Sequence, residues 1–114
     1  MDELAELHCS PVTGTTLQLN EKDVIHYLSQ LEDWRRYNKD SEPRLEKTFA
    51  FTDFKQALTF TNRVAQSAET ENHHPAILTE WGRVTVTWWT HRINGLSLND
   101  FIMAAKTDQL FTEE

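Results

Sequence analysis

The strongest constraint on the fold is a run of alternating side chains that extends from Val84 to His91. β-Branched and aromatic residues dominate this run, and these residue types favour extended backbone. Because successive side chains of a strand point to opposite faces, Val84, Val86 and Trp88 share one face. We therefore predict a strand whose apolar face packs under helices and whose opposite face carries His91.

Three helices are predicted from apolar residues at helical spacing, each starting at a residue that caps helices well. The first begins at Asn20 and is expected to end near residue 33. The second begins at Asp53, with Gln56 three residues later to complete a capping box, and must stop before Pro75. The third begins at Ser97. The apolar face predicted for the second helix consists of Phe54, Ala57, Leu58, Thr61, Val64, Ala65 and Ala68.

Two more strands are expected on either side of a turn. Leu45, Phe49 and Phe51 alternate with polar residues after the turn-forming segment 38–43, which predicts a hairpin. A further extended segment, 76–81, precedes the strand described above. The predicted order is therefore helix, strand, strand, helix, strand, strand, helix. Strands in consecutive pairs indicate an antiparallel sheet with helices on one face, an α+β sandwich.

The length of 114 residues suits one domain with a single core. We expect this domain over residues 17–114, behind a flexible leader formed by residues 1–16. The net charge of −7 argues against nucleic-acid binding, which needs a basic face. No apolar run approaches the roughly 20 residues that span a bilayer, so we expect no membrane partner. The single cysteine, Cys9, cannot form an internal disulfide, which favours a reducing, cytoplasmic location.

Three of the five histidines lie in one stretch of the chain, His73, His74 and His91. Pro75 holds His74 in extended geometry, because a proline ring excludes the helical region for the residue before it. Neighbouring side chains in an extended segment point to opposite sides. His73 and His74 are therefore expected to have different roles.

The residues leave three interpretations of these histidines open. The first is that they are structural residues that satisfy polar ends. The second is a zinc site made from the three imidazoles and Glu69, although adjacent histidines in an extended segment do not easily reach one ion. The third is acid–base catalysis, with Glu69 or Asp100 orienting an imidazole.

A longer pattern resembles, at every motif position, the signature of the pterin-4a-carbinolamine dehydratases. That pattern is Glu69-x3-His73-His74-Pro75-x5-Trp81-x9-His91-x8-Asp100. The resemblance extends to Phe49-x-Phe51-x-Asp53-Phe54, to Thr90-His91 and to Gly95-Leu96, and it covers residues 20–112. The phrases LTEWGRVTVTWWTH and NDFIMAAKTD are most similar to the bacterial branch of the family.

The resemblance implies an enzyme that removes water from a 4a-hydroxytetrahydropterin to give quinonoid dihydropterin, without a metal or an organic cofactor. This pterin substrate is the by-product of aromatic amino-acid hydroxylases, so a functional link to such a hydroxylase is implied as well. Relatives form homodimers or homotetramers. The family fold is a four-stranded antiparallel sheet with three helices packed on one face, in agreement with the order predicted from periodicity.

The same resemblance implies roles for individual residues. His73 and His91 would exchange protons with the leaving hydroxyl, and His74 would orient the pterin. Glu69 and Asp100 would set the tautomer and charge of the imidazoles. Because the three imidazoles lie off the predicted apolar stripes, replacing them is expected to leave the fold intact. The residues expected to line the pocket with them are Trp34, Asn72, Pro75, Trp89, Thr90 and Arg92.

A second class of function stays open at this point. Animal members of this family also act as the dimerization cofactor of a homeodomain transcription factor, so a regulatory protein that works through a protein partner is the alternative. Turnover of freshly formed carbinolamine separates the two classes, because a pure binding protein shows none.

Overall fold

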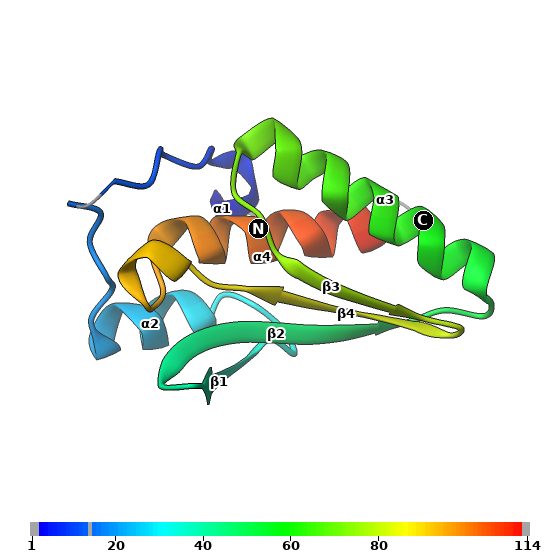
Figure 1. Cartoon of the computed structure of the whole chain (residues 1–114), viewed down its shortest axis with the longest axis horizontal. Helices are drawn as coiled ribbons and strands as arrows, with labels where there is room; N and C mark the ends of the chain where they lie inside the picture. Colours follow the sequence, from blue (N-terminus) through cyan, green and yellow to red (C-terminus); the bar gives the residue numbers. More distant parts are fainter. Residues whose placement is uncertain (1–2, 14, 113–114) are drawn as a thin grey trace.

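The computed structural model describes residues 3–13 and 15–112 and shows a four-stranded antiparallel sheet with strand order β1-β2-β4-β3 (Figure 1). Helices α3 and α4 cover one face of this sheet, and α2 packs beside α4 through Tyr27 and Phe101, whose ring centroids are 5.6 Å apart. The predicted α+β class and antiparallel sheet are confirmed. The elements are α1 (Glu3–Glu6), α2 (Glu21–Leu28), β1 (Arg35–Lys39), β2 (Glu42–Ala50), α3 (Phe54–Glu71), β3 (Ala76–Glu80), β4 (Arg83–Trp88), the 3₁₀ helix η1 (His91–Ile93) and α4 (Leu98–Thr112).

The core lies between the sheet and the helices. Val84, Val86 and Trp88 on β4 are 0% exposed, which confirms the face predicted from their alternation. Leu45 and Phe49 on β2 extend the same buried layer, because the register pairs them with Trp88 and Val84. The central strands of the sheet are therefore those with the strongest alternation in the sequence.

Helix α2 is shorter than predicted, ending at Leu28 rather than near residue 33. After Leu28 the backbone bonds tighten to i→i−3 geometry, with Gln30 N donating to Tyr27 O and Leu31 N to Leu28 O. Asp33 then adopts a positive φ of 65°, which a helix cannot continue. The spacing of Leu31 from Val24 and Leu28 is compatible with a helix, but Leu31 lies beyond the end of α2 and packs against the core from there.

The buried face of α3 differs from the predicted one. Phe60, which lies outside the predicted face, is 0% exposed, whereas Phe54 and Leu58 of the predicted face are 45% and 43% exposed. The core contacts of Phe60 are rings from other elements, with Phe49 and Phe51 at centroid distances of 4.8 and 5.2 Å. Helical spacing alone does not show whether Phe54 or Phe60 would contact Phe49 and Phe51. The predicted members Ala57, Val64 and Ala68 are buried, and Ala65 is exposed.

The start of α3 uses half of the predicted capping box. The Asp53 carboxylate accepts a hydrogen bond from Gln56 N at 2.8 Å. The Gln56 side chain accepts from the Thr52 hydroxyl instead of closing the box. The helix thus begins where the sequence predicts, but the Gln56 side chain bonds to Thr52 and not to the backbone of Asp53.

The N-terminal segment was expected to be a loosely tethered leader, but residues 3–10 pack on α4. Leu4 and Ala5 in α1 are each 5% exposed, and Lys106 Nζ donates to Ala5 O at 2.8 Å. Ser10 and Asn99 exchange two hydrogen bonds of 2.8 and 3.0 Å. Residues 1, 2 and 14 of the predicted leader lie outside the described residues.

No helix in the described ranges is long and apolar enough to cross a membrane.

Candidate active site

A buried hydrogen-bond network joins His73 to the start of α4. His73 Nε2 lies 2.7 Å from Asp100 Oδ1, and the Asp100 side chain is 0% exposed. The second oxygen, Asp100 Oδ2, accepts from the Thr90 hydroxyl at 2.7 Å and from Ser97 N at 2.9 Å. Because a buried carboxylate is costly unless its lone pairs are filled, these bonds hold Asp100 and the His73 ring in one geometry.

The local sequence places His73 at this point. Helix α3 ends at Glu71, and its C-cap, Asn72, takes the left-handed conformation with φ 54° and ψ 43°. This reversal lets His73 N donate to Ala68 O at 3.1 Å and directs the imidazole inward. The ring then stacks on Trp88 with an interplanar angle of 8° and a centroid distance of 5.9 Å. His73 is consequently 6% exposed and packs against β4, although it lies off the apolar stripes predicted from the sequence.

His74 faces the other way, as predicted from Pro75. Its side chain is 54% exposed, and its Nε2 hydrogen-bonds to Glu69 Oε2 on the last turns of α3. The two neighbouring histidines therefore have separate carboxylate partners. This arrangement matches the predicted pairing of Glu69 with an imidazole and gives the two rings different surroundings.

His91 begins η1 rather than ending a strand, because β4 stops at Trp88. Its side chain is 83% exposed, and its Nδ1 lies 3.0 Å from Glu42 Oε2 at the start of β2. The adjacent Thr90 forms a bridge with Gly95 and also contacts Asp100, so His91 and His73 are joined through this short segment. The tertiary fold thus brings both imidazoles to one end of the sheet.

Glu42 and Arg44 were not predicted as site residues. Arg44 donates to Glu42 Oε1 at 2.8 Å, and its guanidinium lies 3.9 Å from the centre of the Trp89 ring. The hydrogen bond from Arg44, with a further contribution from His91, holds the pKa of Glu42 below its ordinary value despite burial. No sequence pattern points to this pair, because Glu42 lies within the turn-forming segment 38–43.

The other predicted pocket residues have mixed positions. Trp89 is half-buried under Arg44, and Arg92 is exposed and donates to Val12 O at 3.3 Å. Asn72 serves as the C-cap of α3, and Pro75 is half-buried beside the histidines in the chain.

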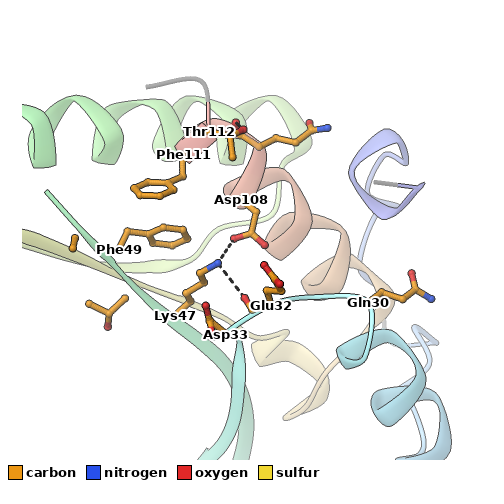
Figure 2. A pocket seen from close by; sticks show the side chains of 11 residues that line it. Gln30, Glu32, Asp33, Lys47, Phe49, Asp108, Phe111 and Thr112 are labelled. Atoms are coloured by element: carbon orange, nitrogen blue, oxygen red, sulfur yellow. Dashed lines mark hydrogen bonds and ion pairs between the residues drawn. The ribbon is translucent and has the colours of Figure 1, made fainter. Parts of the chain in front are cut away.

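Trp34 is not brought to the histidines. Its indole nitrogen donates to Asp108 at 3.0 Å, about two turns along α4 from Asp100. This places Trp34 beside a groove of about 690 Å³ toward the other end of the sheet. Figure 2 shows Lys47 between Asp108 and the Glu32 backbone in this groove. The groove is separate from the imidazole–carboxylate pairs.

Within the described ranges, no group of three or more histidine, cysteine, aspartate or glutamate residues is placed to hold a metal ion. Instead, His73, His74 and His91 each have one ring nitrogen within hydrogen-bond distance of a different carboxylate. Such pairing orients a ring, fixes its tautomer and leaves the second nitrogen for a ligand.

The fold and site together define a small α+β domain in which His73, His74 and His91 each pair with a carboxylate. The chain belongs to the pterin 4 alpha carbinolamine dehydratase family, whose model matches residues 17–110. The resemblance stated from the motif is thereby confirmed.

The similar proteins include two bacterial relatives that match along nearly their whole length. One from Chlorobaculum tepidum is 49% identical over 110 residues, which cover 96% of this chain and 99% of the relative. One from Microcystis aeruginosa is 43% identical over 114 residues, covering 100% and 98%. Both are provisionally named pterin-4-alpha-carbinolamine dehydratase.

Two solved structures are similar in fold. A transcriptional coactivator/pterin dehydratase from Brucella Melitensis has a TM-score of 0.76 and 32% identity, covering 82% of this chain and 98% of its own. A pterin dehydratase-like protein identified as a RuBisCO assembly factor in the alpha-carboxysome has a TM-score of 0.59 and 28% identity, covering 69% and 89%.

Proposed function

We propose that this protein is a hydro-lyase that converts a 4a-hydroxytetrahydropterin into quinonoid dihydropterin and water. The observation that carries the proposal is the buried pair of His73 and Asp100, in a chain that belongs to the dehydratase family. A separate reductase would then reduce this product and so return tetrahydropterin to an aromatic amino-acid hydroxylase. This role fits a cytoplasmic protein that uses no cofactor.

The reaction needs two proton transfers. The bond between C4a and its hydroxyl oxygen breaks as the N5 lone pair forms the C=N bond, and the oxygen takes a proton to leave as water. N5 then loses its proton, so the sum is one carbinolamine giving one quinonoid dihydropterin and one water. An imidazole can supply or accept these protons near neutral pH, and each such transfer is worth about 10²–10⁴-fold in rate.

The geometry supports different roles for the three histidines. Asp100 holds Nε2 of His73, so Nδ1 is the nitrogen available to the substrate. Glu42 holds Nδ1 of His91, so Nε2 is available. We assign these two atoms to proton exchange at the hydroxyl and at N5. His74, which is exposed and paired with Glu69, would orient the pterin ring.

A coupled assay tests the activity. An aromatic amino-acid hydroxylase generates carbinolamine at limiting pterin, and excess reductant converts quinonoid dihydropterin into tetrahydropterin. The rate of tetrahydropterin regeneration is measured with and without this protein. We expect an acceleration that saturates with carbinolamine concentration. An unchanged rate with folded protein would overturn the proposal.

Variants test the assignment of the imidazoles. His73→Ala and His91→Ala should each lower kcat by about 10²-fold or more, and the double variant should approach the uncatalysed rate. His74→Ala should mainly raise KM, because it removes ground-state contacts. His26→Ala, an exposed histidine of α2, is the matched control and should leave both constants unchanged. A double variant with wild-type kcat would refute the assignment.

Action through a protein partner is the second candidate function. The similar structures include one titled a transcriptional coactivator and one titled a RuBisCO assembly factor. The coupled assay separates this candidate from the first, since a protein that only binds a partner gives no turnover.

A further inference from the structure

We propose that Glu42 is a positioning residue for catalysis, which holds the His91 ring so that Nε2 faces the substrate. The inference rests on the proposed dehydratase function, because it assigns His91 to the reaction. It adds a carboxylate outside the motif that carries the family resemblance. Glu42 would therefore be the third carboxylate that holds an imidazole of the site, in addition to Glu69 and Asp100.

The contacts of Glu42 are those of an anchored carboxylate. Its side chain is 8% exposed, with Oε1 accepting from Arg44 at 2.8 Å and Oε2 lying 3.0 Å from His91 Nδ1. With its amide nitrogen turned toward the carboxylate, Asn94 donates to the same Oε2 at 3.1 Å. Two of these partners, His91 and Asn94, bracket η1. Glu42 thereby ties this 3₁₀ turn to the start of β2.

The hairpin between β1 and β2 accounts for the placement. Asp40 and Ser41 both have positive φ, 53° and 65°, as the two central residues of a type I′ turn require. This tight turn pairs Glu42 with Lys39 and starts β2 immediately. Glu42 is thus fixed by the strand register and does not depend on a flexible loop.

Arg44 restrains Glu42 from the other side. Its guanidinium stacks over the Trp89 ring at 3.9 Å, and its side chain is only 14% exposed. A charged hydrogen bond between two restrained groups loses little side-chain entropy when it forms. The exposed His91 ring, which would otherwise sample several rotamers, is thus held by a carboxylate that is already immobile.

The kinetics of Glu42→Gln test whether Glu42 positions His91 for catalysis or only supports the fold. Glu42→Gln keeps the shape but has one acceptor oxygen, which Arg44 claims, so the amide NH₂ faces His91 and no longer accepts from Nδ1. We expect kcat to fall about tenfold, the lower end of the range known for groups that orient a functional imidazole, with little change in KM. Glu46→Gln is the matched control, because Glu46 lies on the same strand and pairs with Arg35 at 2.7 Å. It should leave kcat unchanged.

A double-variant cycle decides whether Glu42 acts through His91. If it does, Glu42→Gln should lower kcat in the wild-type background and have no further effect in a His91→Ala background. An equal loss in both backgrounds would overturn the proposal. Glu42→Asp keeps the charge on Arg44 but shortens the reach to His91, so it should give an intermediate kcat and serves if the glutamine variant does not fold.

A nitrogen NMR measurement keeps the test independent of activity. The neutral His91 ring of the wild type should carry its hydrogen on Nδ1, and Glu42→Gln should abolish this preference. If the wild type shows no turnover, the dehydratase proposal fails while the tautomer still reports on the Glu42–His91 contact. An identical His91 tautomer in both proteins would refute the positioning role.

Discussion

Asp100 carries more of the site than any other single side chain described here. It contacts His73, Thr90 and Ser97 at once, and it is completely buried. In the sequence it is the third residue of α4, where a carboxylate commonly accepts from the capping residue's backbone. The capping role and the orientation of His73 are performed by the two different oxygens of one carboxylate.

Asp100→Asn should therefore affect turnover and stability together. The amide nitrogen would donate to His73 Nε2 and force the ring hydrogen onto Nδ1, the atom proposed to face the substrate. We expect kcat to fall by roughly 10²-fold or more, by analogy with amide replacement of the carboxylate behind a catalytic histidine. The free energy of unfolding should fall by about 1–3 kcal/mol, the cost of a poorly satisfied buried polar group.

Steady-state kinetics and urea unfolding check this prediction. Asp108→Asn is a matched control, because Asp108 lies on the same helix and pairs with Lys47 and Trp34 outside the histidine group. It should alter stability and leave kcat unchanged. Wild-type kcat in Asp100→Asn would contradict the role given to the His73–Asp100 pair.

At the scale of elements, the end of α3 determines where two histidines point. Asn72 takes a left-handed conformation that is strained for most residues but tolerated by asparagine and glycine. The next residues are then directed inward at His73 and outward at His74. The reversal at Asn72 thus directs His73 inward, and the extended backbone before Pro75 turns His74 to the opposite side.

Substitution of Asn72 tests this account. Asn72→Gly should keep the free energy of unfolding near the wild-type value, whereas Asn72→Val should lower it by about 1–2 kcal/mol because a β-branched residue resists positive φ. Urea unfolding measures both. Asn62→Val, at an exposed position within α3, is the control and should cost little, since asparagine and valine have similar helix propensities. Equal stabilities for the glycine and valine variants would contradict the prediction.

The N-terminal segment is attached through Glu71 on the last turn of α3. Glu71 accepts from Cys9 N and hydrogen-bonds to the His8 ring, each at 2.7 Å. Burial raises the pKa of Glu71, but the bonds from Cys9 and His8, with the charge of Lys106, outweigh it and hold the pKa below its ordinary value. Burial, reinforced by the Glu71 and Asp100 carboxylates, raises the pKa of the Cys9 thiol to about 12.

Glu71→Gln should remove a pH-dependent part of the stability. A carboxylate whose pKa is depressed by folding stabilises the protein above its unfolded pKa of 4.5, and this contribution is lost as pH falls through the folded pKa. The variant should therefore have a lower Tm than the wild type at neutral pH, with the difference shrinking below pH 4.5. Thermal unfolding between pH 7 and pH 3 measures it.

Alkylation of Cys9 provides a second readout for the same variant. The wild-type thiol should react slowly at neutral pH, and Glu71→Gln should react faster because the segment is released. Glu6→Gln, at an exposed position of α1, is the control and should match the wild type in both measurements. A Tm difference that is constant with pH would argue against this role of Glu71.

At the scale of the whole molecule, the sheet has two open edges. β1 and β3 each pair on one side only within the described chain, and unpaired edges tend to be covered or paired between subunits. Leu78 on β3 is 59% exposed, and Trp81 in the next turn is 70% exposed. This side of the sheet therefore presents apolar surface together with unpaired backbone groups.

We accordingly expect a homodimer or homotetramer. Sedimentation at micromolar concentration should give a mass above that of the 13.3 kDa chain, and Leu78→Lys should shift the equilibrium toward the monomer. Leu17→Lys, at a leucine that is 81% exposed outside the sheet, is the control and should leave the mass unchanged. A wild-type monomer at this concentration would count against self-association.

The sequence by itself determined the features that depend on local rules. Alternation placed Val84, Val86 and Trp88 in the core, and the proline after His74 separated the two histidines, because side-chain direction follows from backbone geometry over a few residues. The order of helices and strands predicted the α+β sheet, because strands in consecutive pairs form an antiparallel sheet that helices can cover. The motif identified the family, because it specifies residue types at fixed spacing and needs no knowledge of contacts.

Only the tertiary structure decided which distant residues meet. Glu42 and His91 are 49 positions apart, and their contact depends on the strand register and on a turn with two positive φ angles. Phe60 is buried because rings on other elements pack against it, and Trp34 lies beside Asp108 because α4 passes over it there. No periodicity encodes such contacts, since they arise from packing energies summed over segments that are far apart in the chain.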